Sequence, residues 1–252
     1  MNIEWGIGGA QPAKGFHGFV MADLGRSIVG GDFPANSILP RDADLLKRYG
    51  VSRTVLREAL KTLAAKGLIQ AKAKIGTRVL SRSNWNLFDP DILKWHAESG
   101  AIDAQFLFDL QEMRVALEPE AARLAALRRT DNQVAELFSC VEEMGKPGVT
   151  GPDFVDSDLR FHVTVAEASQ NPFMRAINVL IEVALEAAFR VSSPIPNTVA
   201  HERAITRHLA IAQAIEDRDS TRAHAAMHLV IQEGIDRVAT VTGVVSPQGP
   251  TQ

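Results

Sequence analysis

The chain has 252 residues, 46% hydrophobic and 23% charged, an ordinary globular composition that excludes a mainly disordered or fibrous chain. It shows no secretory signal pattern and no run of roughly 18 apolar residues, and its single Cys140 excludes an internal disulfide, so we expect a soluble, cytoplasmic protein. The charges that sum to the net charge of -3 are unevenly distributed along the chain. Residues 1–82 hold 13 Lys and Arg against 6 Asp and Glu, whereas residues 83–252 hold 14 against 24. The basic first part is expected to bind a polyanion.

The basic part predicts three helices followed by a hairpin. Apolar spacing and turn residues place helices over about residues 17–29, 41–50 and 52–67, and strand-like runs over 68–74 and 77–81. Ser52 is a good N-cap for the third helix. This order, with a tight turn between the last two helices, is typical of a winged helix-turn-helix domain, here over residues 10–82.

One face of the third expected helix is polar and basic, and the hairpin tip is basic as well. The predicted DNA contacts are Arg53, Thr54, Arg57 and Lys61 on the helix and Lys72, Lys74 and Gly76 at the tip. A recognition helix enters the major groove by its N-terminal half, where arginine pairs with guanine and a hydroxyl holds a phosphate. The alternative is a solvated basic face on an ordinary helical hairpin.

The second part predicts a mainly helical domain over residues 101–243. About six helices are expected between Ala104 and Thr242, with breaks near residues 146–152, 171–172 and 192–197, and no convincing strand. A linker over residues 83–100 joins the two domains, and its Trp85 and Trp95 are expected to pack against a domain or a subunit. Residues 244–252 are expected to form a disordered tail. The predicted fold class is therefore mainly α, a winged helix-turn-helix with a small β-hairpin followed by an all-helical effector domain.

Polar residues interrupt the apolar faces of three of these helices. Asp158 and His162 lie four residues apart on one stripe, and Arg114 and His208 lie on two others. Burying such groups without a partner costs several kcal/mol, so they are expected to meet one another or a ligand. Asp158 with His162 and His208 is a sensible donor set for a divalent metal such as zinc, nickel or manganese.

Each of these residues also has a purely structural interpretation. Asp158 and His162 can pair with each other and hold helices together. Arg114 can form an internal salt bridge to Glu118 one turn on, or it can grip an effector carboxylate through its bidentate fork. Arg237 can hold an acidic ligand, or it can be a surface arginine near a frayed helix end.

Two stretches carry a resemblance to a known family. SRTVLREALKTLAAKGLI followed by GTRV resembles the DNA-binding domain of the GntR family of bacterial transcription regulators. The pieces EMRVALEPEAARLAA, Asp158 with His162, RHLAIAQAIEDRD and AHAAMHL resemble the FCD class of that family, an all-helical effector domain. The resemblance implies that Arg53, Thr54 and Arg57 touch operator DNA and that Gly76 lets the wing approach a groove.

The FCD resemblance also implies a metal set with one further histidine, whose position is occupied here by Val230. The nearby His224 and His228 point roughly 100° or more away from that position on the helix, so neither replaces it. The linker stretch from Trp85 to Trp95 resembles that of sugar-acid-sensing members, which share the loss of the last histidine. The resemblance therefore favours an aldonate effector such as galactonate or gluconate.

These observations favour a homodimeric repressor that binds operator DNA and is controlled by a small carboxylic acid bound by Arg114, Arg237 and the Asp/His/His set. A rival is a metal-dependent enzyme that uses Asp158, His162 and His208, although no separate acid/base pair or nucleophile accompanies them. A third possibility is a DNA-binding protein whose helical half only dimerises.

Overall fold

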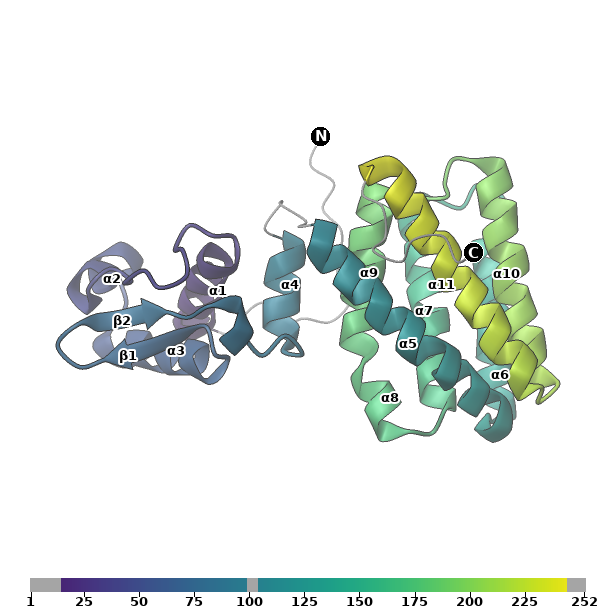
Figure 1. The fold of residues 1–252 in the computed structure, drawn as a ribbon, viewed down its shortest axis with the longest axis horizontal. Coiled ribbons are helices and arrows are strands. Elements are labelled where there is room, and N and C mark those ends of the chain that lie inside the picture. The colour runs from purple at the N-terminus through teal and green to yellow at the C-terminus, as the bar shows by residue number, and fades with distance from the viewer. Residues whose placement is uncertain (1–14, 99–103, 244–252) are drawn as a thin grey trace, which may run out of the picture. The chain divides into compact units, whose positions relative to one another are not determined.

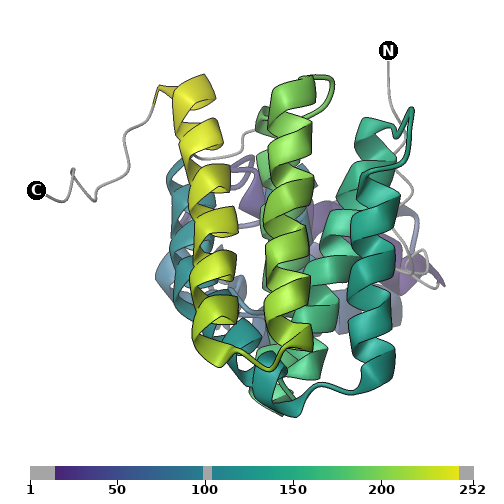
Figure 2. The same cartoon turned by 90° about the vertical axis from the view of Figure 1, so that its right-hand side faces the viewer.

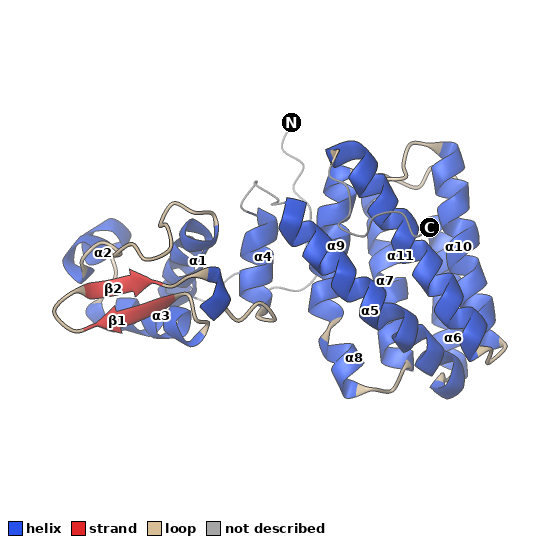
Figure 3. Cartoon of the chain, in the orientation of Figure 1, coloured by secondary structure: helices blue, strands red, loops and turns tan. Residues whose placement is uncertain are grey.

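The computed structural model describes residues 15–98 and 104–243, and the expected tail at 244–252 lies outside them. The chain divides into two compact units, residues 1–102 and 103–252. Figure 1 shows a first unit in which helices surround a β-hairpin and a second unit built of helices alone, and Figure 3 separates the helices from the strands by colour. The predicted fold class is confirmed. None of the helices in the described ranges is long and apolar enough to cross a bilayer.

The first unit has the order of a winged helix-turn-helix. Its elements are α1 (Gly15–Val29), α2 (Asp42–Tyr49), α3 (Arg53–Ala65), β1 (Ile69–Lys72), β2 (Gly76–Val79), the short 3-10 helix η1 (Arg82–Asn84) and α4 (Pro90–Glu98). The two strands pair antiparallel, with Ile69 opposite Val79 and Lys72 opposite Gly76. The first strand ends two residues earlier than the sequence suggested because residues 73–75 form the turn, and the second begins one residue earlier, at Gly76.

Local sequence signals set the turn between α2 and α3. Gly50 ends α2 in the left-handed conformation, with φ of 63°, and its N–H donates to the carbonyl of Leu46. The Ser52 hydroxyl then caps α3 by accepting a hydrogen bond from the N–H of Val55 at 3.3 Å. On α3, Leu56 and its apolar neighbours turn inward, which leaves the opposite face free for a partner.

The segment expected to be a linker forms part of the first unit. Helix α4 packs on α1, and Trp95 is only 2% exposed. Its ring lies so close to Gly25 that a Cβ on that residue would be 2.3 Å from the nearest ring atom. The indole N–H of Trp85 donates to the carbonyl of Leu80 at 3.2 Å. Both tryptophans therefore pack against the rest of the first unit.

The second unit is a bundle of helices. These are α5 (Ala104–Arg128), α6 (Asp131–Met144), α7 (Gly151–Ala168), the short α8 (Pro172–Ala176), α9 (Asn178–Val191), α10 (Thr198–Glu216) and α11 (Ser220–Thr242). Figure 2 looks onto α11, α10 and α6, which stand side by side. Helix α5 packs against α7 and α11, and the core between the helices holds Phe154, Phe161 and Met227, each no more than 1% exposed.

Candidate functional site

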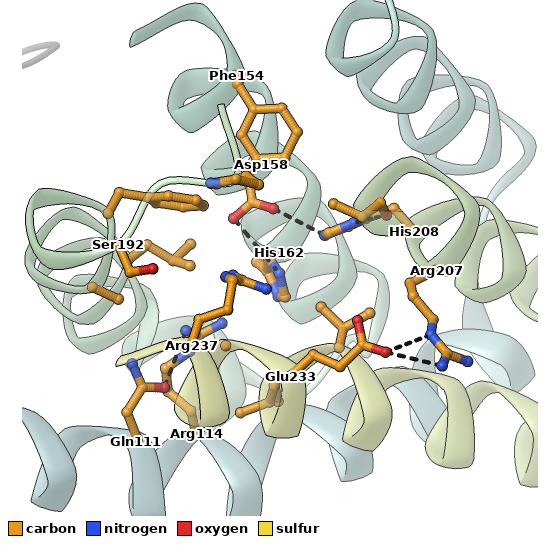
Figure 4. A pocket seen from close by; sticks show the side chains of 18 residues that line it. Gln111, Arg114, Phe154, Asp158, His162, Ser192, Arg207, His208, Glu233 and Arg237 are labelled. Carbon is orange, nitrogen blue, oxygen red and sulfur yellow. Dashed lines mark hydrogen bonds and ion pairs between the residues drawn. The ribbon is translucent and has the colours of Figure 1, made fainter. Parts of the chain in front are cut away.

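The second unit contains a small cavity that brings together the polar residues expected to lie inside. Figure 4 shows side chains from α5, α7, α10 and α11 converging on it. Its volume is about 30 Å³, which is room for about one water molecule or an ion. We call it the inner cavity. Its polar lining includes Gln111, Arg114, Asp158, His162, Ser192, Arg207, His208, Glu233 and Arg237.

Asp158, His162 and His208 form a buried cluster at one end of the inner cavity. One donor atom from each lies within 4.8 Å of those of the others. His208 Nε2 is 3.0 Å from Asp158 Oδ1, and His162 Nε2 is 3.9 Å from Asp158 Oδ2. Helix α7 supplies Asp158 and His162 one turn apart, and α10 supplies His208, as the apolar stripes predicted.

The other ring nitrogen of each histidine is already used. His208 Nδ1 donates to the carbonyl of Ala204 at 2.7 Å, and His162 Nδ1 donates to Glu118 at 2.5 Å. Each imidazole therefore turns its Nε2 toward the carboxylate of Asp158. Neither Nε2 atom nor Asp158 Oδ2 has a hydrogen-bond partner within the described part of the chain. A carboxylate and two imidazole nitrogens that converge in this way are a donor set suited to a metal cation.

Glu118 connects this cluster to Arg114 on α5. One of its carboxylate oxygens accepts from His162, and the other accepts from Arg114 Nε at 2.5 Å. Burial alone would raise the pKa of Glu118, but Arg114 and His162 outweigh it and lower the pKa to about 2. The pKa of Asp158 is also below its ordinary value, because its electrostatic attraction to His208, 3.0 Å away, outweighs burial. Both carboxylates are therefore ionised at neutral pH.

The salt bridge of Arg114 to Glu118 is thus formed in this structure, while Arg114 still lines the inner cavity. Sequence reasoning recognised this pair from its spacing but missed the second contact of Glu118 across to His162. Gln111, one turn before Arg114 on the same stripe, was also missed. Its side-chain oxygen accepts from Arg114 Nη1 at 3.4 Å.

Arg237 and Val230 both line the inner cavity from α11. Figure 4 shows the Arg237 side chain extending toward Asp158 and His162. Burial lowers the pKa of Arg237, and its Nε has no hydrogen-bond partner among the described residues. Val230 places an apolar side chain in the same cavity. The site therefore has an apolar side chain at the position of the fourth metal-binding residue and a cationic side chain in the same cavity.

The predicted DNA contacts lie together on the surface of the first unit. Arg53, Thr54, Arg57 and Lys61 are all exposed on one face of α3, and Lys72, Lys74 and Gly76 are exposed at the turn between β1 and β2. Lys74 and Gly76 have positive φ angles of 62° and 118°, which the tight turn requires. Glu58 accepts from Lys61 at 2.9 Å, so one basic group of the helix is partly neutralised within the chain.

Comparison with protein families matches both units. The model described as bacterial regulatory proteins, gntR family, matches residues 17–79, and the FCD domain model matches residues 109–233. The second match contains most of the cavity residues, including the Asp/His/His cluster, but it ends before Arg237.

Several characterised and uncharacterised proteins are similar along most of the chain. The galactonate operon transcriptional repressor of Escherichia coli (strain K12) is 29% identical over 228 residues, which is 88% of this chain and 96% of the relative. The uncharacterized HTH-type transcriptional regulator YieP of the same strain is 33% identical over 217 residues, 85% and 92% of the two chains. The transcriptional repressor NanR of Klebsiella aerogenes is 29% identical over 211 residues, 82% and 79%.

One solved structure supports the fold. It is that of Lar, described as controlling the expression of the Listeria monocytogenes agr system. It superimposes with a TM-score of 0.61 at 18% identity and covers 90% of this chain and 98% of its own.

Proposed function

Because the chain belongs to the GntR family of bacterial transcription regulators and carries an FCD domain, we propose that it is a repressor whose operator affinity is controlled by a small carboxylic acid. Its relatives are transcription regulators, so the metal-dependent enzyme is rejected as an interpretation of the Asp/His/His cluster. Two of the relatives are named as repressors, which supports the direction of control.

The proposed DNA contact uses the exposed basic face of α3 and the wing. Arg57 extends from the N-terminal half of α3, with 71% of its side chain exposed, as a groove contact requires. The chain acts as a homodimer in this proposal, so that two recognition helices meet two half-sites about one helical turn apart. The dimer has one geometry that fits the operator and one that fits it poorly, and the acid binds the second more tightly. An acid with equal affinity for both geometries would not change their populations and would leave operator affinity unchanged.

The proposed effector is a sugar acid, such as galactonate or gluconate. Support comes from the similarity to a repressor named for a galactonate operon and from cationic groups in a cavity that also holds metal-type donors. Arg237 is the proposed partner of the acid's carboxylate, because its guanidinium is desolvated and incompletely bonded. Arg114 is the second, through the guanidinium N–H groups that do not donate to Glu118.

A divalent metal is the proposed companion of the acid. Asp158, His162 and His208 would hold it, and the single observation that carries this proposal is that one donor atom from each of these buried residues lies within 4.8 Å of the other two. When bound, such an ion supplies positive charge and open coordination positions for oxygen ligands. Glu118 and the carbonyl of Ala204 orient the two imidazoles for this role.

A thermal-shift and titration experiment tests the proposal. Galactonate and gluconate are added to the full-length protein, before and after chelation and with manganese or zinc restored. We expect a rise in the unfolding temperature that needs both acid and metal, because a ligand of the folded state stabilises it. The variant Asp158→Ala should lose the shift and keep operator binding. A protein that binds operator DNA but no acid in any condition would indicate a helical unit that only dimerises.

A further inference from the structure

A second cavity lies beside the inner cavity and shares two residues with it, Glu233 and Arg237. This outer cavity has a volume of about 270 Å³. The rest of its lining comes from residues 197–203 at the start of α10 and from Asp236 and Thr240 on α11. Two cavities that share a pair of side chains are separated by little more than those side chains.

Arg237 is the movable part of this boundary. Its Nε is buried without a hydrogen-bond partner in the described structure, so the guanidinium forms fewer hydrogen bonds than it could, and moving it breaks none at this nitrogen. The guanidinium lies beside Gly234, one turn earlier on α11, where a Cβ would be 3.8 Å from Arg237 Nη2. Because glycine has no side chain, it leaves space next to the guanidinium. Glu233 is fixed by contrast, because Arg207 donates to it from two nitrogens at 2.9 and 3.0 Å.

The volumes decide what each cavity can accept. The inner cavity, at about 30 Å³, has room for an ion or a water but not for a sugar acid. The outer cavity is several times larger. Joined, they reach the roughly 300 Å³ at which ordinary ligand pockets begin.

We infer that the effector site is composite: Arg237 shifts, the carboxylate end of an acid takes the space that its guanidinium leaves beside the metal position of the inner cavity, and the carbon chain lies in the outer cavity. This inference rests on the proposed function and adds how the site is divided and which side chain moves. The outer cavity suits hydroxyl groups, because it is lined by Asn197, Arg203, Asp236 and Thr240. The ligand is therefore an acid of about five or six carbons with several hydroxyls, and a two-carbon acid fills only the space that the Arg237 guanidinium leaves.

Blocking the outer cavity tests this division. The variant Ala200→Cys places a thiol in the outer cavity, and Leu229→Cys places one on the exposed surface of α11, where 45% of the native side chain is exposed. Alkylation with a bulky maleimide will select these thiols, since the native Cys140 is 0% exposed and burial raises its pKa to about 12. Labelling follows folding, so neither variant has to fold around the added group.

Calorimetric titration of manganese-loaded protein then compares gluconate with glycolate. We expect gluconate to bind more tightly than glycolate, and the label at position 200 to weaken gluconate at least tenfold while leaving glycolate unchanged. The label at position 229 should change neither. Equal loss for both acids, or no loss for either, would overturn the composite site while the proposed function stands.

A reagent for histidine tests the connection without any effector. Diethyl pyrocarbonate acylates accessible imidazoles, and mass spectrometry reports its rate at His208. Arg237→Met should speed that reaction, and the label at position 200 should slow it. If wild-type protein binds no acid at all, the proposed function fails, and unchanged acylation rates in both variants would then overturn the connection between the cavities as well.

Discussion

Replacing Glu118 by glutamine is expected to destabilise the second unit strongly, although the side chain keeps its shape. Glu118 is 2% exposed and contacts two cationic or donor groups, Arg114 Nε and His162 Nδ1, each at 2.5 Å. The substitution leaves the Arg114 guanidinium buried without a countercharge. Breaking a buried ion pair in this way costs about 3 to 5 kcal/mol. For a unit of this size the melting temperature should fall by roughly 10 °C.

Glu120 supplies a matched control on the same helix. It forms the same kind of pair with Arg123, at 2.7 Å, but both side chains are well exposed. The variant Glu120→Gln should therefore melt like the wild type, because solvent already screens the charges. Thermal unfolding followed by circular dichroism, on chelated protein near neutral pH, compares the two variants without a contribution from metal.

The same pair of variants separates the orienting role of Glu118 from its charge. Metal affinity should fall about 10- to 100-fold in Glu118→Gln, since a ligand histidine loses the carboxylate that orients it. Operator affinity should stay unchanged in both. Equal melting temperatures for Glu118→Gln and Glu120→Gln would refute the interpretation of Glu118 as the countercharge of a buried arginine.

Two further predictions concern the first unit. Arg57→Ala should abolish operator binding, measured by fluorescence anisotropy, and leave the acid-induced thermal shift intact. The control Arg123→Ala should change neither property. Unchanged operator affinity in Arg57→Ala would contradict the assignment of α3 as the recognition helix. Gly25→Ala should destabilise the first unit by about 1 to 3 kcal/mol, because the new Cβ would lie 2.3 Å from the Trp95 ring. The control Gly151→Ala, at the start of α7 in the second unit, adds a Cβ that meets nothing within 4 Å and should not destabilise the protein. Chemical denaturation measures both, and similar midpoints would rule out the close packing of α4 on α1.

The features that sequence reasoning recovered are those set by short-range patterns. The capping Ser52, the left-handed Gly50 and the apolar face of α3 all act within a turn or two, so the winged helix-turn-helix could be predicted from its own residues. The Asp/His/His cluster was predictable for a related reason. Asp158 and His162 are one turn apart on α7, and each stands out on an otherwise apolar stripe.

What sequence reasoning missed depends on how helices distant in the chain face each other. The contact of Glu118 with His162 joins residues 44 apart, and no periodicity in α5 or α7 indicates it. The outer cavity is a further example, because residues at the start of α10 and residues of α11 line it together. The inward direction of Arg237 follows from the same packing, since an arginine seven residues after Val230 can point inward or along the surface.

Val230 offers a direct test of the site's departure from a four-residue metal set. Its side chain lines the inner cavity on the same helix as Arg237, so Val230→His brings a third imidazole to the Asp158 cluster. We expect zinc or nickel affinity, measured by competition with a chromophoric chelator, to rise at least about tenfold, which corresponds to about 1.4 kcal/mol.

Leu229→His is the matched control for that variant. It adds the same residue one position earlier, on a side of α11 where 45% of the native side chain is exposed, about 100° around the helix. Its metal affinity should equal that of the wild type. If both variants bind metal equally, position 230 does not face the cluster. If Val230→His binds more tightly but loses its response to gluconate, the position left open by valine is one that the effector uses.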